Sequence, residues 1–95
     1  GGDVALRRCR DIMLTNNQIL SPKYRGVYLD DCTRCRVSGN AVAAEEGDEE
    51  TLLAPITVTG GGGNHIVHNS VPAGKDGAVV CDAAQNRVEN NYPAA

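Results

Sequence analysis

Residues 26–43, GVYLDDCTRCRVSGNAVA, contain the pattern that decides the fold. Apolar residues alternate with polar ones in three short runs, which are VYL at 27–29, CRV at 35–37 and NAV at 40–42. Such alternation is typical of half-buried β-strands, and the runs are too short for helices. The stretch therefore predicts two short strands and a third, shorter one, separated by corners.

The same pattern occurs four times along the chain, and its most regular feature is a repeated asparagine. Successive asparagines in this column are separated by 23, 29 and 22 residues. They are Asn17, Asn40, Asn69 and Asn91. Self-similarity at a period of this size indicates a solenoid of stacked units. We therefore predict one domain over residues 1–95, with coils at roughly 3–22, 26–44, 55–73 and 77–94.

The longest interval contains an acidic insertion at residues 45–54. Its acids are Glu45, Glu46, Asp48, Glu49 and Glu50. Insertions in repeat proteins usually form loops on one face, so we expect a solvated loop here. The insertion lacks the alternating aspartates of a dedicated calcium loop. We therefore expect no metal and no cofactor, and calcium binding by this loop stays open as an alternative.

The composition predicts a layered aliphatic core. The 95 residues include no Phe, no Trp and three Tyr, although 41% of them are hydrophobic. Stacked strands about 4.8 Å apart would bury rings of Val, Ile and Leu without any large aromatic side chain. The formal net charge of −3 disfavours a nucleic-acid partner. No apolar run approaches the roughly 20 residues of a membrane span, so no membrane partner is expected.

The asparagine column predicts a sharp corner followed by a buried ladder. The residues that precede these asparagines are Asn16, Gly39, His68 and Asn90. Gly adopts a positive φ freely, and Asn and His are enriched there among the other residues. Each asparagine after the corner would then point inward, where stacked amides satisfy one another.

These V-x-L, I-x-L and N-x-I units resemble the right-handed parallel β-helix of pectate lyases, polygalacturonases, polysaccharide epimerases and phage tailspikes. The resemblance covers nearly the whole chain and implies an all-β, single-stranded solenoid of about four coils. Solenoids need covered ends, and the only capping feature in the sequence is Pro93, so we expect a segment of a longer β-helix whose ends are covered by further coils, with a small or oligomer-capped protein as the alternative. The resemblance also favours an extracellular or cell-envelope location.

The resemblance implies two classes of function, because this fold carries many activities. The first is a segment of a secreted carbohydrate-binding or polysaccharide-processing protein of the lyase, hydrolase or epimerase kind, with a polysaccharide as partner. The second is a non-catalytic structural or assembly module, as in tailspike-like or surface proteins. The outward residues of the first sheet include neither the pair of acids that an inverting hydrolase needs nor the base beside calcium carboxylates that is usual in the lyases. The catalytic residues therefore stay unassigned, and the segment is expected to be scaffold.

The outward positions of the first strands provide the glycan-binding candidates Arg7, Tyr28 and Asp30. A cation, an aromatic ring and a carboxylate on adjacent coils would suit an acidic sugar, whereas the simpler alternative is a surface ion pair between Arg7 and Asp30. The same alternation predicts that Val79 and Cys81 face outward on the fourth coil.

A second outward column contains Arg36, His65 and Arg87, together with Met13. We interpret it as a mildly basic strip on the second sheet and keep its three basic residues as alternative site candidates. Ordinary surface and turn positions for His65 and His68 are the simpler interpretation.

The cysteines allow three interpretations. Cys9 and Cys32 share one column, so a ladder of buried thiols is favoured, while a disulfide between them stays open. The Cys32-Thr-Arg-Cys35 spacing on its own is weak support for a metal site, because zinc needs a second pair of ligands. Cys81 is expected to be an exposed thiol.

Overall fold

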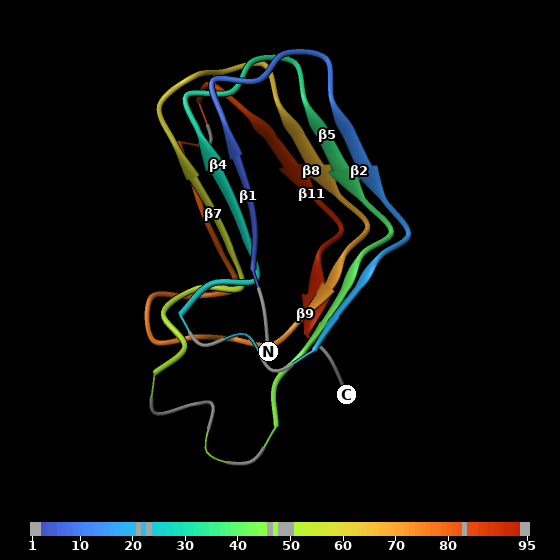
Figure 1. The fold of residues 1–95 in the computed structure, drawn as a ribbon, viewed down its shortest axis with the longest axis vertical. Helices are drawn as coiled ribbons and strands as arrows, with labels where there is room; N and C mark the ends of the chain where they lie inside the picture. Colours follow the sequence, from blue (N-terminus) through green and yellow to red (C-terminus); the bar gives the residue numbers. More distant parts are fainter. Residues whose placement is uncertain are drawn as a thin grey trace.

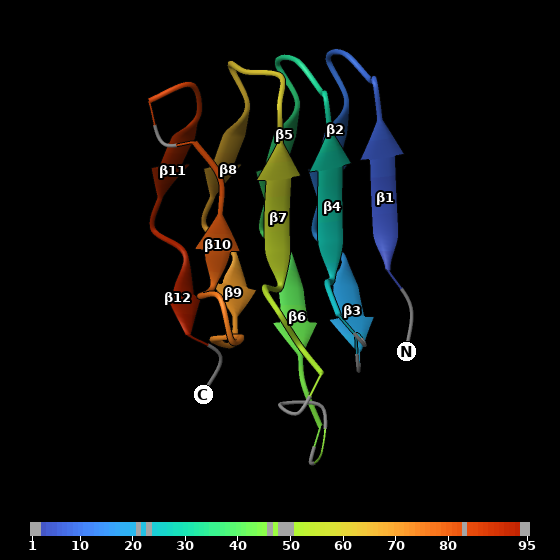
Figure 2. The ribbon, with the colours of Figure 1, turned by 90° about the vertical axis from the view of Figure 1, so that its left-hand side faces the viewer.

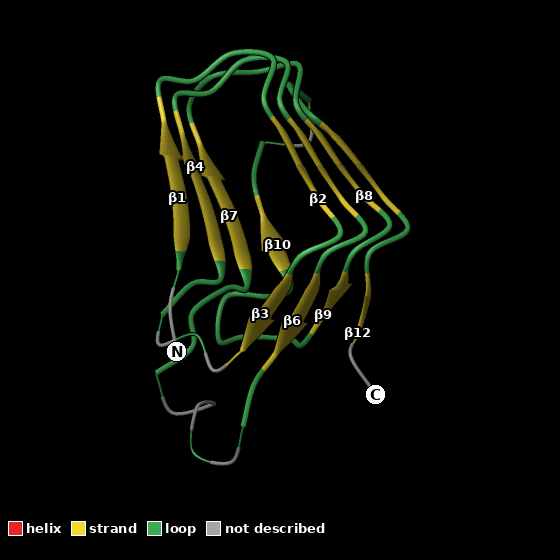
Figure 3. Cartoon of the chain, turned by 45° about the vertical axis from the view of Figure 1, so that its right-hand side comes forward, coloured by secondary structure: helices red, strands yellow, loops and turns green. Residues whose placement is uncertain are grey.

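The chain winds into a coil of short strands that stack in register, as the computed structural model shows (Figure 1). The structure describes residues 3–20, 22, 24–45, 47, 51–82 and 84–93. The strands are β1 Val4–Arg7, β2 Met13–Thr15, β3 Gln18–Leu20, β4 Val27–Asp30, β5 Arg36–Ser38, β6 Ala41–Ala43, β7 Ile56–Thr59, β8 His65–Val67, β9 Ser70–Val71, β10 Val79–Val80, β11 Arg87–Glu89 and β12 Tyr92–Pro93. The described residues form no helix, as Figure 3 also shows, and hence none that is long and apolar enough to cross a membrane.

Three parallel sheets form the wall of the coil, and each takes one strand from every repeat. The first sheet has the order β1-β4-β7-β10, the second β2-β5-β8-β11, and the third β3-β6-β9-β12. Every named strand pairs with its equivalent in an adjacent repeat. Because equivalent strands run in the same direction, all of these pairs are parallel (Figure 2). The predicted all-β solenoid is confirmed.

Among the described side chains, the interior is an aliphatic stack without any aromatic ring. In the second and third coils the inward residues Val27, Leu29, Val37, Ile56 and Ile66 are all 0% exposed. They recur at every second position of their strands, which is the period that places alternate side chains on one face. The sequence pattern therefore identifies the core correctly in these coils.

The prediction for the first strand of the fourth coil is wrong by one residue. Val79 pairs with Ile56 and Val80 with Thr57, so Val80 faces outward while Val79 and Cys81 pack against the core. The cause is a corner that is one residue shorter in this coil. Ile56 and His65 are nine positions apart in the sequence, whereas the equivalent residues Val79 and Arg87 are eight positions apart. A one-residue slip exchanges the two faces of a strand.

The corners contain more left-handed residues than the sequence suggested. The predicted positions before the asparagine column have φ values of 57° at Asn16, 68° at Gly39, 57° at His68 and 54° at Asn90. A second set follows the first sheet. It comprises Arg8, Asp31 and Gly60 at one position and Asp11, Arg34 and Gly63 three residues later, with φ between 52° and 70°. Gly60 and Gly63 thus replace charged residues that hold the same backbone shape on the first and second coils.

The segment after the acidic stretch is part of the wall. Of the predicted insertion, Glu46, Asp48, Glu49 and Glu50 lie outside the described residues. Leu52 and Ala54 are each 1% exposed. The Leu53 backbone N donates to the Tyr24 carbonyl at 2.9 Å, and the Lys75 N donates to the Leu52 carbonyl at 3.0 Å. Residues 51–55 therefore form the corner that leads into β7, and this corner is hydrogen-bonded to the corresponding corners of the coils before and after it.

Candidate functional site

An asparagine ladder runs along the corner between the second and third sheets. The Nδ2 of Asn17 donates to Oδ1 of Asn40 at 3.1 Å, Asn40 donates to Asn69 at 3.1 Å, and Asn69 donates to Asn91 at 2.8 Å. The backbone N of each donor residue reaches the same oxygen. Asn40 and Asn69 are 1% exposed, as predicted, but the predicted burial is wrong for Asn17 on the first coil, which is exposed. The ladder satisfies amides that would otherwise be buried at a large cost.

A second, shorter ladder lies at the start of the second sheet, and it was not predicted from the sequence. The Nδ2 of Asn64 donates to Oδ1 of Asn86 at 2.9 Å, and Oδ1 of Asn64 accepts the backbone N–H of Cys35 at 2.8 Å. Asn64 is 0% exposed. The available signal was the interval of 22 residues from Asn64 to Asn86, the same as from Asn69 to Asn91. The first two coils have Ile12 and Cys35 in this column, which concealed the repeat.

The outer face of the first sheet brings together the three glycan-binding candidates. Arg7 Nη1 lies 3.2 Å from Asp30 Oδ2, and the Arg7 Cζ lies 5.6 Å from the centroid of the Tyr28 ring. Thr59 Oγ1 donates to the Tyr28 hydroxyl at 3.1 Å. The Arg7 side chain stays 63% exposed despite its ion pair. Its guanidinium therefore remains accessible for a second anionic contact.

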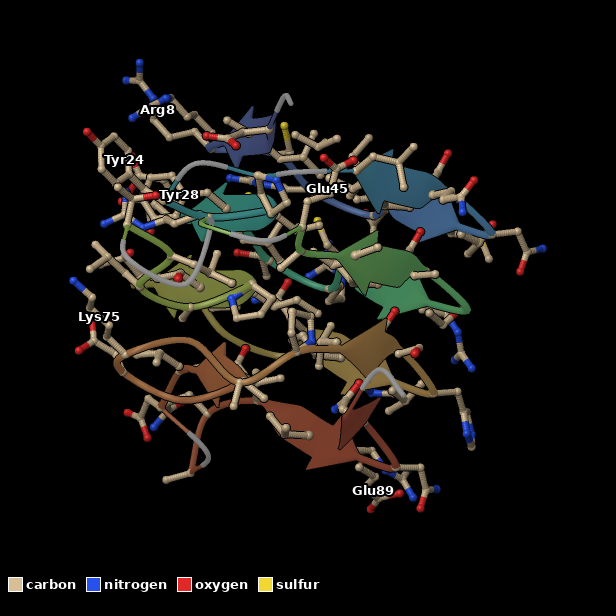
Figure 4. All side chains as sticks on the ribbon, turned by 90° about the horizontal axis from the view of Figure 1, so that it is seen from below. Arg8, Tyr24, Tyr28, Glu45, Lys75 and Glu89 are labelled. Carbon is tan, nitrogen blue, oxygen red and sulfur yellow. The ribbon has the colours of Figure 1, made fainter. Side chains whose placement is uncertain are left out.

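Arg25 joins this cluster although it was not among the predicted residues. Its Cζ lies 4.7 Å from the Tyr28 ring centroid, within the range of a cation–π contact. Tyr24 is 47% exposed and projects from the same side of the molecule as Tyr28 (Figure 4). Arg25 lies before β4 in a corner, where strand alternation does not apply, so only the side-chain contact identifies it.

The second-sheet candidates also lie together. Arg36, His65 and Arg87 pair in register on neighbouring strands. They line a hollow of about 210 Å³ that also contacts Val67, His68 and Glu89. Arg87 Nε lies 3.1 Å from Glu89 Oε1, so these two charges offset each other.

All four cysteines are free thiols in the structure. Cys9 and Cys32 are neighbours in one column, because the Thr33 N donates to the Cys9 carbonyl at 2.9 Å. Burial raises the pKa of the Cys35 thiol, and burial also raises the pKa of Cys81, which is partly covered rather than exposed as expected. Among the described residues, no three His, Cys, Asp or Glu side chains are placed to hold a metal ion.

One further ion pair lies at the corner after the first sheet. Arg34 Nε lies 2.9 Å from Asp11 Oδ1, and the Arg34 guanidinium that binds this carboxylate lowers the pKa of Asp11. Both side chains are more than half exposed. This pair links the first two coils at the surface and is separate from both candidate sites.

These features define a parallel β-solenoid with polar ladders at its corners and charged outer faces. The chain belongs to the family described as the right handed beta helix region, whose model matches residues 3–92. A comparison with curated proteins and one with solved structures found no significant match.

Proposed function

We propose that this chain is a β-helical scaffold that contacts an acidic polysaccharide through the outer face of its first sheet. The contact serves binding rather than turnover. The carboxylates of the sugar units would meet the guanidiniums of Arg7 and Arg25. Asp30 would accept hydrogen bonds from sugar hydroxyls, and the Tyr28 hydroxyl would accept or donate them.

The observation that supports this proposal is the convergence of Arg7, Tyr28 and Asp30 from two adjacent coils. An exposed ion pair contributes little to folding stability, so the cluster has a small structural role at most. Arg7 and Arg25 both approach the Tyr28 ring, which concentrates positive charge on one surface. The sole carboxylate of the cluster, Asp30, is already paired with Arg7, and general acid–base cleavage of a glycosidic bond needs two.

The test measures binding and turnover together. Polygalacturonate and alginate are titrated into the protein with and without calcium, and the release of unsaturated or reducing ends is followed in parallel. We expect weak binding that requires calcium, because the acids at 45–50 would otherwise repel the polymer. Arg7→Ala should abolish binding.

The matched control is Arg10→Ala, which removes the same charge from the same coil but lies after the end of β1. It should leave binding nearly unchanged. Equal losses in both variants would contradict a specific contact at the first sheet. Robust turnover by the unaltered protein would contradict the binding role.

The second candidate function is a non-catalytic assembly module, which the apolar surface of the outer coils favours. Ile12 is 40% exposed on the first coil, and a hollow of about 370 Å³ on the fourth is lined by Ala78, Val79 and Val88 among others. Under this alternative no tested polysaccharide binds, and sedimentation velocity detects association that increases with protein concentration.

A further inference from the structure

We infer that the hollow on the second sheet is an oxyanion site, in which Arg36, His65 and His68 hold a sulfate or carboxylate group. The hollow occupies the outer face of β5, β8 and β11. Figure 1 shows these strands across the core from β1, β4 and β7. The site is therefore separate from the proposed glycan contact on the first sheet.

The charge balance of the hollow favours an anion. Its lining contains two guanidiniums, two imidazoles and one carboxylate. The carboxylate of Glu89 is paired with Arg87 at 3.1 Å. In the described part of the chain, Arg36 has no ion-pair partner, so its guanidinium is the uncompensated charge of the hollow. Two histidine rings beside it add N–H donors and no negative charge.

The floor and the corner of the hollow are held in place by packing and by backbone hydrogen bonds. Val67 faces outward between these donors but is only 5% exposed, so it forms an apolar floor that the surrounding side chains cover. His68 is held at the corner by two backbone hydrogen bonds: its N donates to the Glu89 carbonyl at 3.2 Å, and its carbonyl accepts the Gly39 N–H at 3.1 Å. The backbone that carries the His68 imidazole therefore loses little conformational freedom when an anion binds.

A metal ion is the other ligand that two histidines and a glutamate suggest. The described residues place no group of three such side chains close enough to hold one, and Glu89 is turned toward Arg87. The positive charge of the Arg36 guanidinium would also repel a cation. An oxyanion accepts hydrogen bonds from every donor that the hollow offers.

The experiment follows the imidazole and backbone NMR signals of the full chain while sodium sulfate or sodium galacturonate replaces sodium chloride at constant ionic strength. Sulfate and galacturonate distinguish a free oxyanion from the carboxylate of an acidic sugar, and neutral galactose serves as the uncharged control. We expect saturable shifts of the His65 and His68 rings in the millimolar range with at least one of the two anions. Arg36→Gln should weaken this binding roughly tenfold or more, because a charge-assisted hydrogen bond is lost.

Arg34→Gln is the matched control, since it lies on the same coil and its guanidinium is held by Asp11 instead of facing the hollow. It should leave the anion affinity unchanged, and a preserved backbone spectrum shows that each variant is folded. Three results would overturn the inference: shifts equal to those in chloride, an unchanged affinity in Arg36→Gln, or an anion response that Arg7→Ala removes. The last result would move anion binding to the first sheet.

Discussion

Leu6 and Leu29 occupy the same column of the solenoid on adjacent coils, and their surroundings differ. Leu29 is 0% exposed, with strands β1 and β7 on its two sides, while Leu6 is half-buried and has a neighbouring strand on one side among the described residues. The same contrast separates Asn40 from Asn17. Amino-acid type and position in the repeat are equal within each pair, so the neighbouring coils alone account for the difference in burial.

This comparison shows where the stability of the molecule resides. Each coil of a solenoid contacts only its neighbours, so the free energy of folding is approximately a sum over coils and interfaces. The second and third coils have two such interfaces each, and the first and fourth have one each within the described chain. Identical substitutions should therefore cost more in the middle coils than in the outer ones.

The largest effect is expected for Leu29→Ala compared with Leu6→Ala. Removing a fully buried leucine side chain leaves a cavity, and the free energy of unfolding should fall by about 2–5 kcal/mol. Leu6→Ala should cost about 1 kcal/mol, because its side chain is already partly hydrated. Urea unfolding of both variants measures the difference. Equal losses would show that the first coil is covered in solution by something outside the described residues.

The ladder gives the second comparison, Asn40→Leu with Asn17→Leu. Asn40 Oδ1 accepts both the N and the Nδ2 of Asn17, and its Nδ2 donates to Asn69 and to the Leu14 carbonyl. Its loss leaves buried groups without partners and should cost about 1–3 kcal/mol. Asn17→Leu should cost less than about 1 kcal/mol, because the backbone N of residue 17 can still donate to Asn40. The same urea titration measures both variants, and a larger loss for Asn17→Leu would contradict the role assigned to burial.

The ladder also shows why much of the fold could be predicted from the sequence. Every coil must satisfy the same buried amide at the same corner, so the requirement repeats as Asn17, Asn40, Asn69 and Asn91 and becomes visible. The first strand of the fourth coil gave no such signal. Its residues 78–81 are Ala, Val, Val and Cys, so alternation could not decide which face is buried, and a corner one residue shorter changed the register.

The candidate sites were only partly predictable for a related reason. Strand alternation placed Arg7, Tyr28 and Asp30 on one face because all three lie within paired strands. Arg25 lies in a corner, and the hollow on the second sheet depends on Val67, an apolar residue at an outward position. Both features arise from side-chain packing between coils, which a periodic pattern does not encode.

The smallest effect is expected in the reactivity of the four thiols, and it compares the same coils once more. Cys32 and Cys35 in the second coil are buried, whereas Cys9 and Cys81 in the first and fourth coils are partly exposed. The thiolate is the reactive form, and burial raises the pKa of both Cys35 and Cys81, so at neutral pH less of either thiol is ionised. The difference between the two groups therefore comes from access, because a reagent reaches the buried Cys32 and Cys35 only when the second coil opens. Native protein without reductant should therefore acquire two adducts quickly and two slowly, with about a tenfold delay for each 1.4 kcal/mol needed to open the second coil. Mass spectrometry counts the adducts over time, and four should be found after denaturation. Two sulfurs that stay protected even then would establish a disulfide, which peptide mapping would assign to Cys9 and Cys32 or to another pair, whereas four equal rates would show that the second coil opens as readily as the outer ones.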